Sequence, residues 1–141
     1  MTTARMYLLD TNIISYWMRG DPAVIPRIQE HAPSELSLCT VTLAEILYGI
    51  EKSPVRKKER RMKIEKISSL LRVYPFDTAA AQRYGGIRAF LEKKGTTISE
   101  RDVQIAAIAS ANRLTVVTHN VREFHRIPDL AVEDWAVRGR P

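Results

Sequence analysis

The sequence predicts an α/β fold, a parallel sheet covered by helices on both faces. Short apolar runs that are typical of buried strands alternate with longer segments whose apolar residues recur at helical spacing. The run Met6–Leu9 is apolar without alternation, as in strands that are buried on both sides. With 141 residues, 45% of them apolar, and no repeat or linker, residues 1–141 are expected to form one domain.

Prolines and glycines set most element boundaries in the first half of the chain. Pro22 is acceptable in the first turn of a helix, whereas Pro33 breaks one. The expected elements are, in order, a strand over Met6–Leu9, a helix ending near Gly20, a helix between Pro22 and Pro33, a strand over Leu36–Cys39, and a helix that opens at Thr42.

The second half begins with a charge-dense stretch, Arg56–Lys66, whose interleaved apolar residues give a helix an inner face. The expected elements that follow are a short strand over Val73–Phe76, a helix capped by Asp77 and ended by Gly95, a helix from Glu100 to Arg113, a strand over Leu114–Thr118, a short turn or helix over Val121–His125, and an edge strand over Leu130–Val132. Trp135 is expected to fold back onto the core.

Composition narrows the setting and the partners. The 22 Lys and Arg residues exceed the 16 Asp and Glu residues and give a formal charge of +6, which favours a polyanionic partner such as RNA, DNA or an acidic protein. The single cysteine, Cys39, cannot form an internal disulfide and is expected to be a small buried hydrophobe. We find no transmembrane run and no signal-like segment, so we expect a soluble cytoplasmic protein without membrane contact.

Three carboxylates are expected to converge at one edge of the sheet. Asp10 ends the first strand, Glu45 follows the second strand by one turn, and Asp102 opens a helix whose apolar face turns inward. Two carboxylates ~4 Å apart repel by about 4 kcal/mol at an effective dielectric constant of ~20, so such a cluster needs a cation. Oxygen ligands without Cys–His pairs indicate Mg²⁺ or Mn²⁺ and disfavour zinc.

A purely structural interpretation stands beside this one. Asp10 or Thr11 could simply cap the helix that follows. Thr42-x-x-Glu45 and Ser99-x-x-Asp102 both match the capping box, in which the acidic residue satisfies a backbone donor at a helix start. Capping and metal binding are compatible, because a helix N-terminus stabilises a carboxylate in either case.

An ordered series of motifs resembles the PIN-domain ribonucleases, and among them the VapC toxins of bacterial type II toxin–antitoxin pairs. The series covers nearly the whole chain and comprises Leu8-Leu9-Asp10-Thr11-Asn12, the segment Thr40–Gly49, Tyr84-Gly85 with Ile87-Arg88-Ala89, Asp102 with Ile105-Ala106-Ala107, Thr118-His119-Asn120 followed by Arg122-Glu123-Phe124, and Glu133-Asp134-Trp135. The resemblance implies a PIN-like three-layer α/β/α fold with a central, mostly parallel sheet of four to five strands.

The resemblance also implies roles for individual residues. Asp10, Asp102 and Glu45 would bind the metal, while Thr11, Asn12 and Thr118 would orient them or the scissile phosphate. Many PIN domains carry a fourth acidic residue after the last strand, where this chain has His119-Asn120. The catalytic position there falls to Asn120 or to Glu123, the nearest carboxylate. Arg88 and Arg101 are candidates for contacts with the RNA backbone.

The expected function is a Mg²⁺-dependent endoribonuclease toxin, with Mn²⁺ as a substitute ion. Metal-assisted hydrolysis by water predicts a 5′-phosphate product. Among the proteins that the chain resembles, some cut tRNA in the anticodon loop and others cut ribosomal RNA, and tRNA is the expected substrate. The resemblance also implies a cognate VapB-type antitoxin that relieves the inhibition of translation, and a homodimer.

Two alternative functions are compatible with the same sequence features. A PIN nuclease of RNA processing or DNA flap cleavage would carry the same carboxylates, and a catalytically silent RNA-binding module would explain the missing fourth one. A phosphoacceptor receiver domain is excluded, because Asp10 has no adjacent acidic partner and no lysine follows Lys94.

Overall fold

The sheet is fully parallel and has β1 at its centre. The structure, a computed structural model, describes residues 5–137. Strand order is β3-β2-β1-β4-β5, and each neighbouring pair is parallel. The strands are β1 (Tyr7–Leu9), β2 (Leu36–Cys39), β3 (Arg72–Tyr74), β4 (Thr115–Val117) and β5 (Val132–Glu133). This arrangement confirms the predicted parallel α/β sheet.

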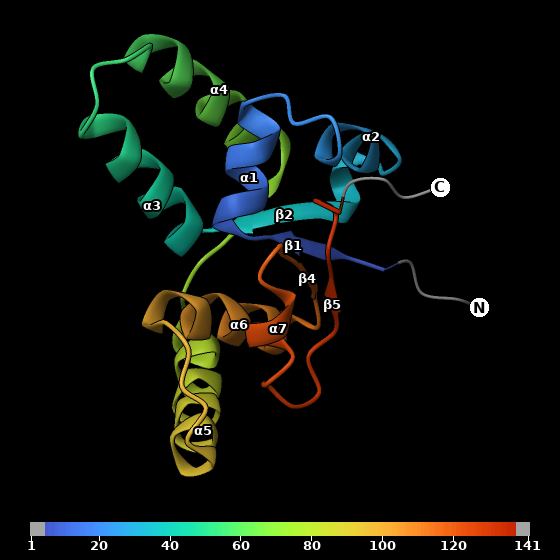
Figure 1. The fold of residues 1–141 in the computed structure, drawn as a ribbon, viewed down its shortest axis with the longest axis vertical. Coiled ribbons are helices and arrows are strands. Elements are labelled where there is room, and N and C mark those ends of the chain that lie inside the picture. Colours follow the sequence, from blue (N-terminus) through green and yellow to red (C-terminus); the bar gives the residue numbers. More distant parts are fainter. Residues whose placement is uncertain (1–4, 138–141) are drawn as a thin grey trace.

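Helices cover both faces of the sheet (Figure 1). The α-helices are α1 (Thr11–Met18), α2 (Val24–Gln29), α3 (Thr40–Glu51), α4 (Lys57–Leu70), α5 (Thr78–Lys94), α6 (Glu100–Asn112) and α7 (Val121–Phe124), and a 3₁₀ turn, η1 (Pro33–Glu35), precedes β2. Figure 1 shows α1–α4 on one side of the sheet and α5–α7 on the other. Among residues 5–137, no helix is both long and apolar enough to cross a membrane.

Successive residues of the central strand point into two separate hydrophobic cores, one on each face of the sheet. Leu9 packs with α1–α4, whereas Leu8 packs with α5–α7, and both side chains are fully buried. Because successive strand residues point to opposite faces, a strand without polar residues is needed where both faces are covered. Trp135 belongs to the first core and is 1% exposed, which confirms that the chain folds back there. Cys39 is buried in the second core, as predicted.

Three predicted boundaries were wrong, each for a physical reason. Helix α3 begins at Thr40 and not at Thr42, because the Thr42 hydroxyl is buried against other side chains and caps nothing. Strand β3 starts at Arg72 and ends before Pro75, which has no amide hydrogen for a ladder. The edge strand lies at Val132–Glu133, later than predicted, because Asp129 adopts a left-handed conformation (φ 61°) that delays the pairing.

Parallel pairing brings the carboxyl ends of the strands to one edge. Residues that follow β1, β2 and β4 therefore lie together, beginning with Asp10, Thr40 and Thr118. The Asp10 amide donates to the Val117 carbonyl at 3.0 Å, so β1 and β4 end side by side. The site is built on this edge.

Candidate active site

Asp10 is a buried carboxylate at the centre of the edge. Its Oδ1 accepts a hydrogen bond from the Ile13 amide at 3.0 Å, so Asp10 caps α1 as expected. Only 3% of Asp10 is exposed, and burial raises the pKa of its carboxyl to about 6. This value already includes smaller contributions: hydrogen bonds from Thr118 and Ile13 lower the pKa, whereas the neighbouring carboxylates of Asp102 and Glu45 raise it. Asp10 is therefore both a helix cap and a member of an acidic cluster.

Glu45 is held in place by the Thr11 hydroxyl and not by a capping box. The Thr11 hydroxyl donates to Glu45 Oε1 at 2.8 Å and is hydrogen-bonded to the Thr42 hydroxyl at 3.2 Å. Thr42 is fully buried, and the Cys39 thiol lies 3.7 Å from its oxygen. The capping interpretation of Thr42-x-x-Glu45 was wrong, because α3 already begins at Thr40 and leaves Thr42 inside the helix.

Asp102 lies in the first turn of α6 and meets the residues that follow β4. Ser99 caps this helix by accepting from the Asp102 amide at 3.2 Å, which confirms that half of the predicted capping box. Partial burial raises the pKa of the Asp102 carboxyl, and the carboxylates of Glu123 and Glu45 add to the rise. The carboxylate thus faces the acidic cluster as well as its own helix end.

Asn120 joins Asp102 to Glu123. Its amide nitrogen donates to Asp102 Oδ2 at 3.3 Å and to Glu123 Oε2 at 2.7 Å. Its backbone amide donates to the Thr118 hydroxyl at 2.9 Å. Both candidates for the fourth acidic position therefore lie beside Asp102, with Asn120 separating the two carboxylates.

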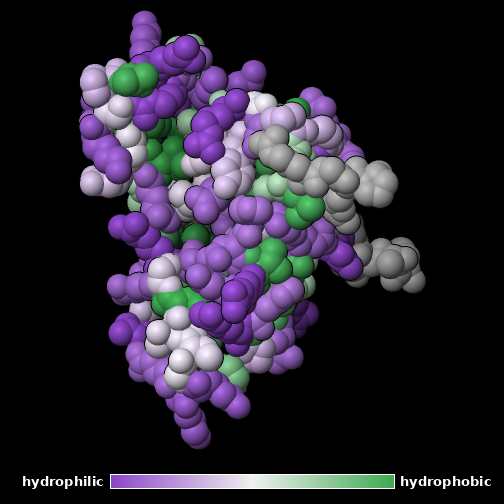
Figure 2. Space-filling model, viewed as in Figure 1, coloured by the Kyte–Doolittle hydropathy of each residue, from purple (hydrophilic) through white to green (hydrophobic). Residues whose placement is uncertain are grey.

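The carboxylates open into a cavity that continues into a larger groove. The cavity, of about 400 Å³, is lined by Asp10, Thr11, Asn12, Glu45, Ser99, Glu100, Arg101 and Asp102. The groove, of about 930 Å³, runs between α1, α3 and α4 and shares Thr11, Glu45 and Arg101 with the cavity. Figure 2 shows hydrophobic residues in the hollow between α3 and α4, within a largely hydrophilic surface. The basic residues that line the groove are Arg19, Lys52, Arg56, Arg60, Lys63 and Arg101.

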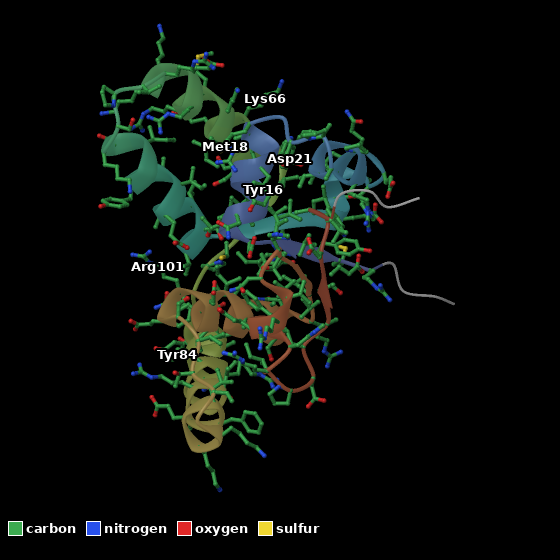
Figure 3. The ribbon with its side chains drawn as sticks, in the orientation of Figure 1. Tyr16, Met18, Asp21, Lys66, Tyr84 and Arg101 are labelled. Atoms are coloured by element: carbon green, nitrogen blue, oxygen red, sulfur yellow. The ribbon has the colours of Figure 1, made fainter. Side chains whose placement is uncertain are left out.

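The two predicted arginines have different positions. Arg101 Nη1 lies 3.3 Å from Glu45 Oε2 and joins α6 to α3 at the cavity (Figure 3). Arg88 donates to Glu92 on its own helix and to the Tyr84 hydroxyl, which in turn donates to Glu100 at the cavity rim. Arg88 is thus connected to the cavity lining only through Tyr84 and does not line the cavity itself.

The sequence interpretation missed two features of this edge. Glu100 lines the cavity, a role signalled only by its place beside Asp102. His119 Nδ1 lies 3.1 Å from Asp134 Oδ2, and its ring packs edge-on against Tyr16, although 53% of the side chain is exposed. Asp134 belongs to the segment after β5, so only the sheet order could have predicted this pair.

The donor set suits a hard divalent cation in kind. Asp10, Glu45 and Asp102 offer only oxygen ligands at the cavity, and Asn120, which is hydrogen-bonded to Asp102, adds an amide oxygen nearby. Within residues 5–137, no group of three or more His, Cys, Asp or Glu side chains is arranged so that it could hold a metal ion. Mg²⁺ rarely needs one, because it retains several waters and is commonly bound through one or two carboxylates. Burial is the main cause of the raised pKa values of Asp10 and Asp102, and neighbouring carboxylates add to both, so a cation here would relieve repulsion.

Comparison with known proteins identifies the family. The PIN domain profile matches residues 7–130. The chain is 38% identical over 129 residues to the tRNA(fMet)-specific endonuclease VapC of Salmonella typhimurium, covering 92% of this chain and 97% of that protein. It is 35% identical over 132 residues to Ribonuclease VapC2 of Rickettsia felis, covering 92% and 98%.

Solved structures agree with the sequence relatives. DNA-bound VapBC from Salmonella typhimurium superposes with a TM-score of 0.86 at 36% identity, covering 94% of this chain and 99% of that chain. VapBC2 from Rickettsia felis, bound to a promoter DNA fragment, gives 0.85 at 33% identity, covering 92% and 98%. Sequence, fold and acidic edge together show that this chain belongs to the PIN-domain family and, within it, to the VapC ribonucleases.

Proposed function

We propose that the protein is the toxin of a VapBC-type module, a Mg²⁺-dependent endoribonuclease that inhibits translation by hydrolysing RNA phosphodiester bonds. The observation that carries the proposal is the convergence of Asp10, Glu45 and Asp102 on one cavity that opens into a basic groove. Acidic residues suit a metal ion, and basic residues beside them suit the phosphates of RNA.

Asp10 and Asp102 would hold the divalent ion directly, with Glu45 as the third carboxylate and Mn²⁺ as a substitute for Mg²⁺. A bound ion would lower the pKa of a water ligand and offset the charge that builds on the phosphate. Glu45 is fixed for this role by Thr11, which occupies one carboxylate oxygen and leaves the other facing Arg101.

The surrounding residues orient ligands and substrate. The Thr118 side chain hydrogen-bonds Asp10, and its hydroxyl accepts a hydrogen bond from the Asn120 amide, so Thr118 links the residues that follow β1 and β4. Asn12 lines the cavity, where its side-chain amide can meet the scissile phosphate. Asn120 keeps Glu123 close to Asp102 as a fourth carboxylate, either for a second ion or for the attacking water.

Hydrolysis by water follows from the residues at the cavity. None of the described residues that line it is a histidine able to deprotonate a ribose 2′-hydroxyl. We therefore expect a 5′-phosphate and a 3′-hydroxyl as products. A 2′,3′-cyclic phosphate would contradict this mechanism.

The proposed substrate is tRNA, cut in the anticodon loop. A relative that is 38% identical is named for tRNA(fMet) cleavage, which supports this substrate class. Loops suit a cleft with metal at its floor, because their unstacked nucleotides expose the backbone. Arg101 lines the cavity and the groove and can contact the phosphates there, with Arg88 behind it.

The groove between α1, α3 and α4 is the proposed seat of a cognate VapB-type antitoxin. The similar solved structures are VapBC complexes, which supports such a partner. An antitoxin segment in this groove would place a basic side chain beside Glu45 and so exclude RNA. We also propose a homodimer that works in the bacterial cytoplasm, where its RNA substrate is found.

Cleavage of defined nucleic acids tests this function. Purified protein is incubated with tRNA and with single-stranded DNA, in Mg²⁺ and in EDTA, and the product ends are identified. We expect Mg²⁺-dependent cuts in tRNA that leave 5′-phosphates. Preferential cutting of DNA would indicate a flap nuclease, and binding without cleavage would indicate an RNA-binding module; either result would overturn the proposal.

A further inference from the structure

Of the described residues that line the acidic cavity, Arg101 alone is basic, and it also lines the adjoining groove. Its guanidinium is paired with Glu45 at 3.3 Å, and 67% of its side chain is exposed, against 23% for Glu45. The arginine is therefore the more exposed partner of this ion pair, and its side chain can change conformation without disturbing the core. Figure 3 shows Arg101 between α3 and α6.

The two oxygens of Glu45 are held by very different groups. Thr11 is anchored at the start of α1 and donates to Oε1, whereas Arg101 contacts Oε2 from an exposed position. Among the described residues, Arg101 is the cation paired with a proposed metal ligand. Any cation that engages Oε2 must compete with this guanidinium.

We propose that Arg101 is a switch residue with two alternative partners. It neutralises Glu45 in the metal-free protein, and it turns into the groove to bind an RNA phosphate once Glu45 is engaged by the divalent ion. The inference rests on the proposed function, because it assigns a coupling between metal and RNA to that same site. A guanidinium suits both partners, since its planar fork pairs with carboxylate and with phosphate.

Two consequences follow from competition for Glu45. Removing the guanidinium removes a competitor and a repelling charge, so the metal should bind more tightly. An exposed ion pair of this kind changes affinity by about two- to fivefold. Removing the guanidinium also removes the phosphate contact that Arg101 can make only after the metal has displaced it from Glu45. RNA affinity should therefore depend less on the metal.

The experiment compares Arg101→Gln with Arg83→Gln, which removes the same charge from an exposed position on α5. Mn²⁺ binding is measured by calorimetry in the absence of RNA. Binding of a fluorescein-labelled tRNA anticodon hairpin is measured by anisotropy with and without Ca²⁺, and the RNA is checked on a gel to be intact. Circular dichroism confirms that both variants are folded.

We expect Arg101→Gln to bind Mn²⁺ about two- to fivefold more tightly than the wild type and to lose at least half of the Ca²⁺-dependent gain in RNA affinity. Arg83→Gln should match the wild type in Mn²⁺ affinity and in that gain. Unchanged Mn²⁺ affinity in Arg101→Gln would overturn the proposal, and so would tighter Mn²⁺ binding with an unchanged gain. Failure of the wild type to bind Mn²⁺ would instead refute the proposed metal site itself.

Discussion

The raised pKa of Asp10 predicts that its carboxylate destabilises the metal-free protein. In the unfolded chain the carboxyl titrates near 3.8, whereas in the folded protein its pKa is about 6. The folded state therefore binds the proton more tightly, so this carboxyl has no effect on stability below about pH 4 and destabilises the fold increasingly as the pH rises through about 6. The difference between the two pKa values corresponds to about 3 kcal/mol at 1.36 kcal/mol per pKa unit.

Replacing Asp10 by Asn should recover most of this energy at neutral pH. Asparagine caps helices as well as aspartate does, so the bond from the Ile13 amide can remain, while Thr118 can accept from the new amide. In EDTA at about pH 7.5, Asp10→Asn should be more stable than the wild type by about 2–3 kcal/mol, or roughly 6–12 °C in Tm. The gain should vanish near pH 4, where the wild-type carboxyl is protonated.

The assay is urea unfolding followed by circular dichroism, from about pH 4 to about pH 8, with EDTA and with excess Mg²⁺. Asp77→Asn is the matched control, because Asp77 caps α5 in the same way, with the Ala80 amide at 3.0 Å, but is exposed. Mg²⁺ should stabilise the wild type and not Asp10→Asn, so the difference between their free energies of unfolding should shrink when Mg²⁺ is present. A gain that is absent in EDTA, or equal at all pH values, would refute the reasoning.

Three further predictions concern positioning and packing. Thr11→Val removes the donor to Glu45 and should weaken Mn²⁺ binding several-fold in calorimetry, at a cost of about 1 kcal/mol in stability; unchanged binding would show that Thr11 does not position Glu45. Arg60 donates to four carbonyls at the end of α3 and beyond, so Arg60→Ala should lose about 1–3 kcal/mol in urea unfolding, and full recovery in Arg60→Lys would contradict the role of its fork. Trp135→Ala should lose about 3–5 kcal/mol because the ring is buried and stacked on His31, whereas Val137→Ala, at an exposed site, should lose little.

The convergence of the carboxylates was predictable because topology alone determines it. Apolar strands without alternation require a covered parallel sheet, and parallel strands end at one edge. Asp10 and Asn120 follow β1 and β4, which are neighbours, so their meeting with the first turn of α6 needed no side-chain detail. The same reasoning located Glu45 near the end of β2, although the structure places it in the second turn of α3.

Local sequence patterns were less informative where tertiary contacts determine the partners of a side chain. Ser99-x-x-Asp102 and Thr42-x-x-Glu45 are equivalent as sequences, yet Ser99 caps a helix and Thr42 does not. The difference arises because Thr42 is buried against Thr11, a residue 31 positions away. The pairing of Arg101 with Glu45 spans 56 positions and could not be predicted from a local pattern either.

If the acidic edge performs Mg²⁺-dependent RNA cleavage, the loss of one of its carboxylates must abolish that cleavage. The most direct measurement is the initial rate of tRNA cleavage by Asp102→Asn beside Asp129→Asn, a matched substitution at an exposed left-handed turn that favours asparagine. We predict a loss of at least a hundredfold for Asp102→Asn and a wild-type rate for Asp129→Asn. Equal rates for the two variants would contradict the assignment of the active site.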